Sequence, residues 1–283
     1  MRAENICLIC GSLDHEEKIS YDAPDKYEEA AGVIEENYFR KWIKCLGCGF
    51  HYSIYSRPAD ILDLLYEKIY RDPGSFWRKE SAVDMFRRVI KLPDEQSETR
   101  RRVKWIKEKM GDVFEDGVAP AGKPPYEMLD IGGATGVFAY EFKDDQWRSS
   151  VADPSEEGRF LQEEYQIPYV QKKYMSGLFD HKFDLISLVF SLEHISDPDS
   201  LLTDVKADLS ERSFIYIEVP DAIAFDLKQQ DDDIFNSCHL WMFDPHTLLR
   251  LMSRCGFHAY SLDRVKTIRG HYSLMVIGGP VWK

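Results

Sequence analysis

The residues best suited to chemistry lie in the stretch LDIGGATG, where an apolar run leads into Asp130 and then into Gly132, Gly133 and Gly136. A strand that ends in a glycine turn and continues as a helix is typical of a cofactor site, because glycine lets the backbone turn sharply and approach a ligand. The turn differs from the G-x-G-x-x-G of dinucleotide sites, since Ala134 is the middle small residue and the acid precedes the glycines.

A second acid supports a cofactor site. Asp153 stands at the end of the next strand-like run, SSVADP. A carboxylate at the end of the second strand can accept both hydroxyls of a ribose. The residues therefore predict a ribose-containing cofactor. A nicotinamide-linked oxidoreductase stays open as the alternative at this point, although the missing G-x-G-x-x-G pattern weighs against it.

The elements that must position these acids follow from residue 126 onward. Strand-like runs alternate with helical segments; the runs are YEMLDI, SSVADP, PYVQ, FDLISLVF, SFIYIEVP, HAYSLDRV and YSLMVIGG. Alternation of strand and helix is typical of parallel strands joined by crossover helices. We therefore predict an α/β fold with a doubly wound, Rossmann-like and mostly parallel seven-stranded sheet. The last two runs have no helix between them, which predicts an antiparallel pair at the end of the chain.

Candidates for acid–base chemistry lie on the loops after the fourth and fifth of these strands. They are Glu193 and His194 in SLEHISDP, Glu218 and Asp221 in IEVPD, and His239 in NSCHLWMF. Histidine is favoured as a base because its unperturbed pKa lies near neutral pH. His239 is therefore the first candidate for a catalytic base or an acceptor contact, with a purely structural histidine as the alternative.

Two C-x-x-C pairs occupy the start of the chain: Cys7 with Cys10, and Cys45 with Cys48. Two such pairs in a reducing compartment indicate metal more than disulfides. Four thiolates fit a closed tetrahedral zinc site, which stabilises a small unit and has no open position for catalysis. Structural Zn²⁺ is the prediction, with redox pairs or an iron–sulfur cluster as alternatives.

The charge and hydropathy of the chain indicate which kinds of binding partner are disfavoured. The chain has 283 residues and a formal net charge of −13. Nucleic-acid binding depends on Lys and Arg at phosphates, so an acidic chain disfavours large nucleic-acid substrates. The sequence has no apolar run of the length that spans a bilayer and no apolar secretory segment at its start, so no membrane association and a cytoplasmic location are expected.

The sequence divides into three parts. Residues 1–57 form the predicted zinc-knuckle unit, residues 58–120 a helical lid or linker region, and residues 121–283 the α/β domain. Apolar stripes at helical spacing support the middle part: Ile61, Leu64, Leu65 and Ile69; Val83, Phe86, Val89 and Ile90; Val103, Ile106 and Met110. Aromatic side chains there are candidates for a lid over the acceptor: Tyr66, Tyr70, Phe76 and Trp77.

Three motifs in order carry a resemblance to a known family. LDIGGATG resembles motif I, D-x-G-x-G-x-G, of class I S-adenosylmethionine-dependent methyltransferases, with Ala134 at the central glycine. FDLISLVFSLEHISDPDSLL is similar to the fourth strand and EH-x-x-D-P turn of the small-molecule branch, and HLWMFDPHTLLRLMSRCGF to the segment after its fifth strand. The resemblance covers residues 126–283.

The resemblance implies S-adenosylmethionine as the cofactor. The glycine turn would pack on the methionine part, with Asp130 positioning its ammonium group and Asp153 binding the ribose hydroxyls. Met175 would lie against the adenine, and Phe190 would flank the sulfonium or the acceptor. Methyl transfer from a sulfonium is an in-line displacement, so the protein mainly aligns the nucleophile with the methyl carbon.

A zinc-knuckle unit before a methyltransferase domain resembles methyltransferases that act on nucleotide-linked sugars. Their C-methylating members have a Tyr-x-Glu-His cluster after the fifth strand, and here the matching residues are Asn236, Ser237, Cys238 and His239. The predicted acceptor is therefore a small polar molecule, such as a sugar, methylated on oxygen, nitrogen or carbon. The alternatives are an RNA or protein methyltransferase, or a non-catalytic module that binds the cofactor. The oligomeric state stays open.

Overall fold

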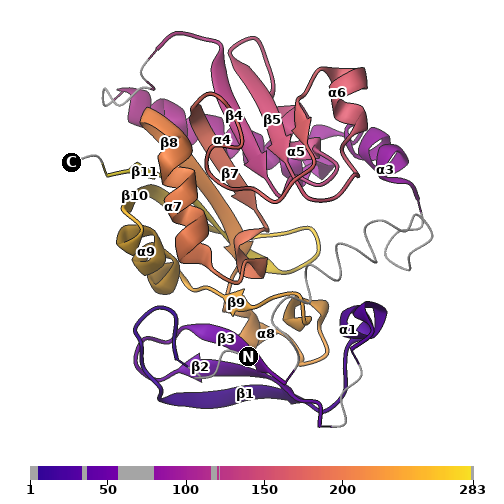
Figure 1. The fold of residues 1–283 in the computed structure, drawn as a ribbon, viewed down its shortest axis with the longest axis vertical. Coiled ribbons are helices and arrows are strands. Elements are labelled where there is room, and N and C mark those ends of the chain that lie inside the picture. Colours follow the sequence, from indigo (N-terminus) through magenta and orange to yellow (C-terminus); the bar gives the residue numbers. More distant parts are fainter. Residues whose placement is uncertain (1–5, 34–36, 57–79, 116–119, 121, 282–283) are drawn as a thin grey trace.

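The computed structural model describes residues 6–33, 37–56, 80–115, 120 and 122–281, which form two sheets with helices around the larger one (Figure 1). The predicted lid residues Tyr66, Tyr70, Phe76 and Trp77, and the stripe from Ile61 to Ile69, lie outside the described residues.

The central sheet has seven strands in the order β10-β11-β8-β7-β4-β5-β6. The strands are β4 (Tyr126–Ile131), β5 (Trp147–Ala152), β6 (Tyr169–Val170), β7 (Phe183–Val189), β8 (Leu209–Pro220), β10 (Phe257–Lys266) and β11 (Tyr272–Pro280). Strands β6, β5, β4, β7 and β8 are parallel, and β11 runs antiparallel to both β8 and β10. The predicted Rossmann-like fold is confirmed, including the antiparallel pair at the end of the chain.

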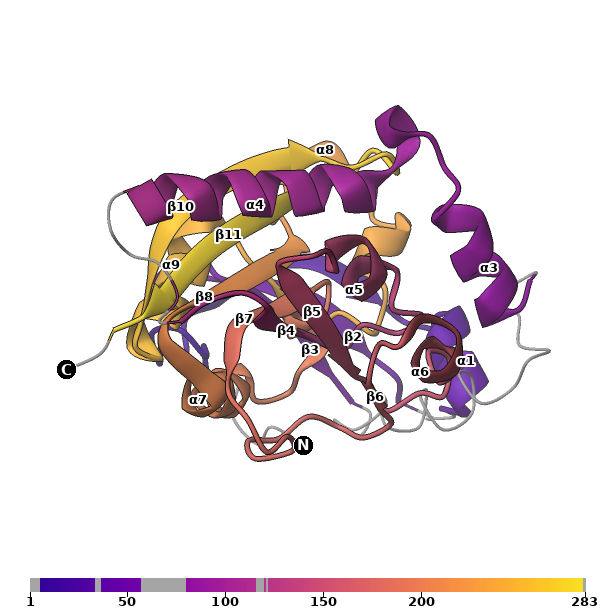
Figure 2. The ribbon, with the colours of Figure 1, turned by 90° about the horizontal axis from the view of Figure 1, so that it is seen from above.

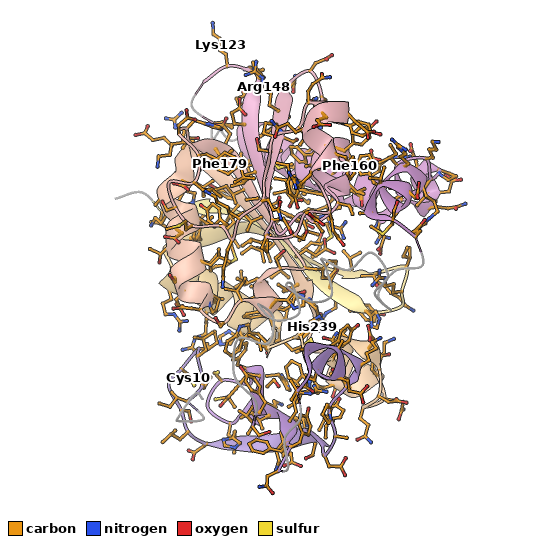
Figure 3. The ribbon with its side chains drawn as sticks, turned by 45° about the vertical axis from the view of Figure 1, so that its right-hand side comes forward. Cys10, Lys123, Arg148, Phe160, Phe179 and His239 are labelled. Carbon is orange, nitrogen blue, oxygen red and sulfur yellow. The ribbon has the colours of Figure 1, made fainter. Side chains whose placement is uncertain are left out.

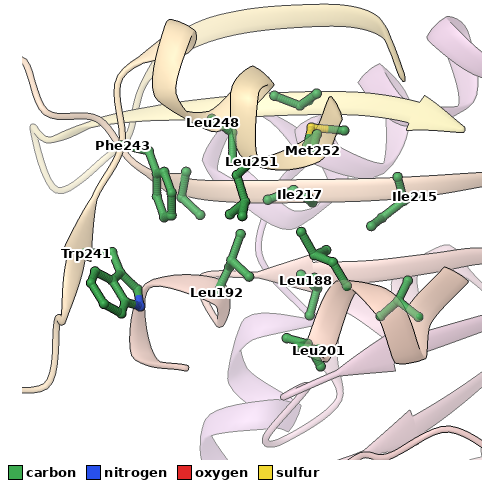
Figure 4. Packing of buried hydrophobic residues seen from close by; sticks show 14 of the residues in the cluster. Leu188, Leu192, Leu201, Ile215, Ile217, Trp241, Phe243, Leu248, Leu251 and Met252 are labelled. Atoms are coloured by element: carbon green, nitrogen blue, oxygen red, sulfur yellow. The ribbon is translucent and has the colours of Figure 1, made fainter. Parts of the chain in front are cut away.

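Helices cover both faces of this sheet. On one face lie α3 (Ala82–Val89), α4 (Glu98–Glu115), α5 (Val137–Phe142) and α6 (Phe160–Tyr165), with α4 running along β10 and β11 (Figure 2). Phe86, Ile106 and Met110 are buried there, as their helical spacing predicted. On the other face, α7 (Pro198–Asp208) and α9 (Pro245–Arg254) pack their leucines onto β7 and β8 (Figure 4).

The second sheet has four strands, and one comes from the far end of the sequence. Its order is β1 (His15–Tyr21), β2 (Arg40–Cys45), β3 (His51–Tyr55) and β9 (Trp241–Met242). The pairing of β3 with β9 joins the N-terminal unit to the segment after β8. Beneath this sheet, Ile19 and Trp42 pack with Phe235 and Met242. Helix α1 (Lys26–Ala31) begins at Asp25, whose side chain also binds the backbone and hydroxyl of Ser237.

The remaining elements are short. They are η1 (Asp94–Gln96), η2 (Leu192–His194), α8 (Ala224–Leu227) and η3 (Asp233–Phe235). Two of them, η2 and η3, follow the carboxyl ends of β7 and β8, where the candidate bases were predicted. Within the described residues, no helix has the length and apolar character needed to cross a membrane.

Candidate active site

The glycine turn lies at the point where the chain leaves the centre of the sheet. Strand β4 has β5 on one side and β7 on the other, so the carboxyl ends of β4 and β7 form the switch point at which open α/β sheets bind ligands. Gly132 has φ 75°, and a Cβ on it would lie 2.5 Å from Ser191 Oγ. Gly136 has φ 72°, and its Cβ would lie 2.1 Å from Leu161 Cδ1. Both glycines are therefore required by backbone conformation and by close packing.

Ala134 occupies the position of the central motif glycine. Its φ is 46°, a left-handed conformation that is unfavourable for a residue with a Cβ. Its backbone N–H donates to Asp153 Oδ2 at 2.9 Å, which ties the turn to the second acid. This hydrogen bond from the Ala134 N–H to the end of β5 helps to hold the left-handed conformation of Ala134.

Asp153 is held firmly at the end of β5. It is 2% exposed, and its Oδ1 accepts from the backbone N–H and hydroxyl of Ser155 at 2.8 and 2.6 Å. Asp130 is also buried, and its Oδ1 accepts from Ser187 Oγ at 2.7 Å. Burial raises the pKa of Asp130 to about 7, and the charge of Asp153 adds to that rise. A cationic group close to Asp130 would favour its ionised form.

A cleft of about 540 Å³ opens above these strand ends. Six of the predicted site residues line it: Gly132, Asp153, Phe190, Glu193, His194 and His239. Four others do not line it: Asp130 is buried, Gly133 lies in the turn close to Asp130, Gly136 packs on Leu161, and Met175 is 63% exposed. Before Met175, the Tyr174 hydroxyl donates to Asp208 on α7 at 2.9 Å. The role proposed for Met175 at the adenine stays a prediction.

The two predicted histidines meet in the cleft, with their ring centroids 4.9 Å apart. His239 lies where the two sheets meet (Figure 3). Its Nδ1 lies 2.7 Å from the carbonyl oxygen of Ile234, and His194 Nδ1 lies 2.8 Å from that of Cys238. A carbonyl only accepts hydrogen bonds, so both Nδ1 atoms carry the proton and both Nε2 atoms are free to accept. Burial lowers the pKa of His239 to about 3 and that of His194 below its usual value, which keeps both rings neutral.

Glu193 is buried beside them. It is 0% exposed, and neither carboxylate oxygen has a hydrogen-bond partner among the described residues. Burial raises its pKa to about 8, and the charge of Glu218 adds to that effect. His194 Nε2 lies 3.9 Å from Glu193 Oε1.

Arg102, on α4, is a cleft residue that the sequence did not indicate. Its guanidinium donates to both carboxylate oxygens of Glu218 and lies 5.7 Å from the ring of Phe190. Tyr216 and Ser273 also donate to Glu218, at 2.7 and 2.9 Å. Although burial acts in the opposite direction, Arg102 holds the pKa of Glu218 below its usual value. Glu218 is therefore an ion-paired anchor and a poor candidate for a base.

Asp221 is also paired. It is fully buried, and Arg264 donates to both of its carboxylate oxygens. Of the five acid–base candidates, Glu193, His194 and His239 therefore form one group facing the cleft, while the two acids at the end of β8 are neutralised by arginines. Phe190 has φ 52°, a strained conformation for a bulky residue, at the same strand end as this group.

The four cysteines converge in the N-terminal unit. Cys7 Sγ lies 3.5 Å from Cys48 Sγ, and Cys10 Sγ lies 3.4 Å from Cys45 Sγ. All four sulfur atoms lie within 4.8 Å of one another, which makes the group suitable for a metal ion. Sulfur atoms around a tetrahedral zinc ion at ~2.3 Å are about 3.8 Å apart, so the observed separations fit.

Comparison with known families and structures agrees with this geometry. The model of a family described as "Methyltransferase domain" matches residues 84–262, which is more than half of the chain. The chain belongs to this methyltransferase family. The methyltransferase match begins within α3 and therefore includes α4, the helix that carries Arg102.

Solved methyltransferases share the fold at low sequence identity. One is 1,6-didemethyltoxoflavin-N1-methyltransferase from Burkholderia thailandensis, with bound 1,6-didemethyltoxoflavin and S-adenosylhomocysteine; it has a TM-score of 0.56 and 14% identity, over 88% of this chain and 98% of that one. Another is an S-adenosylmethionine-dependent methyltransferase from Clostridium acetobutylicum, with a TM-score of 0.50 and 12% identity, over 71% and 98% of the two chains. No curated protein matches the sequence. The chain is a methyltransferase by its family, with the fold of S-adenosylmethionine-dependent methyltransferases.

Proposed function

We propose that this methyltransferase acts on a small polar acceptor of the sugar class, held between the carboxyl edge of the central sheet and the N-terminal unit. The observation that carries the proposal is a polar wall of the cleft, formed by α1 and by segments that follow β8. Hydroxyl, amide, carboxylate, imidazole and guanidinium groups belong to this wall: Tyr27, Asp233, Asn236, His239, Thr267, Arg269, His271 and Tyr272. A hydroxyl-rich molecule matches such a mixture of donors and acceptors.

The volume of the cleft also favours a small acceptor. About 540 Å³ falls within the range of roughly 300–1,000 Å³ that suits small molecules. The net charge of −13 acts against a nucleic-acid acceptor. Tyr27, from α1, contributes to the wall, so the N-terminal unit would take part in acceptor recognition.

His239 is proposed as the base or the acceptor contact. Its free Nε2 faces the cleft, and the turn that carries it is built by Asn236, whose Oδ1 accepts from the N–H of Cys238 at 2.8 Å. A neutral ring of low pKa accepts a proton best from an acceptor that is itself acidified. Oxygen, nitrogen and carbon acceptors all remain in the proposal.

The four cysteines are proposed to hold a structural zinc ion. The two knuckles have matching backbone bonds: Gly11 N–H donates to Cys7 O, and Gly49 N–H donates to Cys45 O, each at 2.9 Å. Both glycines have a left-handed φ, of 75° and 80°. Such turns direct the two sulfur atoms of each C-x-x-C pair toward a common metal position.

Activity with labelled S-adenosylmethionine against nucleotide sugars, glycans, other small metabolites, RNA and protein tests the acceptor class. We expect transfer to a member of the sugar panel and its loss in His239→Ala. Transfer to RNA or protein alone would overturn the proposal. Calorimetry with S-adenosylhomocysteine tests the cofactor contacts separately. Asp153→Ala should weaken binding while Asp145→Ala, at an exposed acid outside the cleft, should not.

A further inference from the structure

Glu193, His194 and His239 share a feature that base catalysis alone does not explain. One atom from each, a carboxylate oxygen and two imidazole nitrogens, lies within 4.8 Å of the others. They come from two separate loops, the η2 turn after β7 and the turn between η3 and β9. Two histidines and one carboxylate are a ligand set typical of divalent metal ions that keep open coordination positions for a substrate.

The hydrogen bonds of the two histidines fix the orientation that a metal ligand needs. Each ring donates from Nδ1 to a backbone carbonyl, of Ile234 for His239 and of Cys238 for His194. A ring held in this way presents the Nε2 lone pair in a fixed direction, which is the usual second-shell arrangement of metal-binding histidines. The orientation of both rings is thus built into the fold before any ligand arrives.

Glu193 supplies an independent observation. Its carboxyl group is fully buried, and both oxygens lack a partner among the residues that the structure describes. An unsatisfied buried carboxylate destabilises a fold by roughly 1–3 kcal/mol or more, so such groups are normally paired or bind a metal. Arg102, the nearby buried cation, is already engaged by Glu218. A cation bound in the cleft would satisfy Glu193.

We propose that Glu193, His194 and His239 bind a divalent first-row transition-metal ion inside the methyltransferase cleft, and that this ion binds and acidifies the acceptor. Ligands at about 2.1 Å from an ion lie roughly 3–3.5 Å apart, so the three groups would approach one another by up to about 1.5 Å on binding. The site is separate from the four-cysteine group: its donors are nitrogen and oxygen, and it lies at the junction of the two sheets (Figure 3).

Besides the acceptor and S-adenosylmethionine, the reaction needs only water, which takes the proton. An acceptor hydroxyl that binds the cation loses its proton to water in the cleft, because a bound divalent ion lowers the pKa of an oxygen ligand. The acceptor oxygen then forms a bond to the methyl carbon of S-adenosylmethionine. The carbon–sulfur bond breaks, and its electron pair stays on sulfur to give S-adenosylhomocysteine. The histidines hold the ion through Nε2, so with the ion bound His239 would contact the acceptor through the ion and would not itself take the proton.

Cobalt binding to the full-length protein tests the site without turnover. Protein loaded with zinc at the cysteines is equilibrated with Co²⁺ alone, and bound cobalt is measured by elemental analysis and visible absorption. We expect one cobalt ion per chain without a sulfur-to-cobalt charge-transfer band. Glu193→Gln and His239→Ala should each weaken cobalt binding by roughly 10-fold or more. His246→Ala, at an exposed histidine outside the cleft, should leave it unchanged.

The inference rests on the proposed methyl transfer, but the two fail in different ways. Wild-type protein that binds no cobalt, or variants that bind it as wild type does, would overturn the metal site while leaving S-adenosylhomocysteine binding intact. Absence of S-adenosylhomocysteine binding would instead overturn the proposed function. Glu193→Gln is isosteric and adds no buried charge, so thermal melting should show a folded variant.

Discussion

The ion pair between Arg102 and Glu218 gives a quantitative prediction for Arg102→Leu. Their side chains are 9% and 3% exposed, so removal of the cation leaves a buried, uncompensated carboxylate. Breaking a buried pair from one side destabilises a protein by about 3–5 kcal/mol. For a chain of this size that corresponds to a decrease in Tm of roughly 6–20 °C. Urea unfolding at pH 7 measures the loss directly.

The pH dependence of this loss has a definite sign. In the wild type the pKa of Glu218 is lowered, so its stabilising contribution is present above the unfolded pKa of about 4.3 and is lost as the pH falls through the folded value. In Arg102→Leu, burial without the cation raises that pKa, and the penalty grows as the pH rises above about 4.3. The difference in stability between the two proteins should therefore decrease from pH 7 to pH 5.

Two further variants complete the test. Arg101→Leu is the matched control, because Arg101 is on the same helix but its side chain is 52% exposed. Glu218→Gln, added to Arg102→Leu, should recover much of the loss, because no charge remains. Tyr216 and Ser273 donate to different oxygens of Glu218, so the amide oxygen would keep one of these bonds and the amide NH₂ would donate to the other hydroxyl oxygen. A loss below about 1 kcal/mol in Arg102→Leu at pH 7, or a loss that is independent of pH, would refute the reasoning.

Three other perturbations have expected outcomes. Gly136→Ala should lower stability by roughly 1–3 kcal/mol and weaken S-adenosylhomocysteine binding, because the new Cβ would meet Leu161. Gly177→Ala has a similar φ with no atom within 4 Å, so it should lose stability alone; equal effects on binding would contradict the packing argument. Cys10→Ser should abolish zinc retention and lower the melting temperature, and zinc analysis showing wild-type content would exclude the thiolate site. Asp130→Asn should flatten the decrease in stability from pH 5 to pH 8 that follows from a folded pKa of about 7; an unchanged urea-unfolding profile would contradict it.

The sequence predicted the central sheet well because each strand had a local signal. Runs such as FDLISLVF and YSLMVIGG match β7 and β11 closely. The glycine turn and Asp153 were recognisable because their spacing is fixed by one strand–turn–helix unit. His194 and His239 were found by their place after particular strands, and the structure brings them to the same cleft.

Long-range contacts could not be predicted in this way. Arg102 stands beside an apolar stripe that predicts a helix but not a partner for the arginine, and only the packing of α4 on the sheet places it against Glu218. Strand β9 has two residues, too few for a periodic signal, and its partner β3 is far away in the sequence. The orientation of the two histidine rings depends on three-dimensional hydrogen bonding, as does the lack of a partner for Glu193 among the described residues. Residue order gives no indication of either.

The pairing of β9 with β3 also determines which segments of the chain can be exchanged together between related proteins. Arg40 and the Trp42 indole both donate to the carbonyl of Phe235, and the neighbouring carbonyl of Ile234 orients His239. A chimaera that replaces only residues 1–56 would keep a loop, proposed to recognise the acceptor, whose shape depends on a different N-terminal unit. The transferable module is discontinuous: it joins the N-terminal unit to residues 221–243, and recombination that respects this boundary should preserve the acceptor preference of the donor protein.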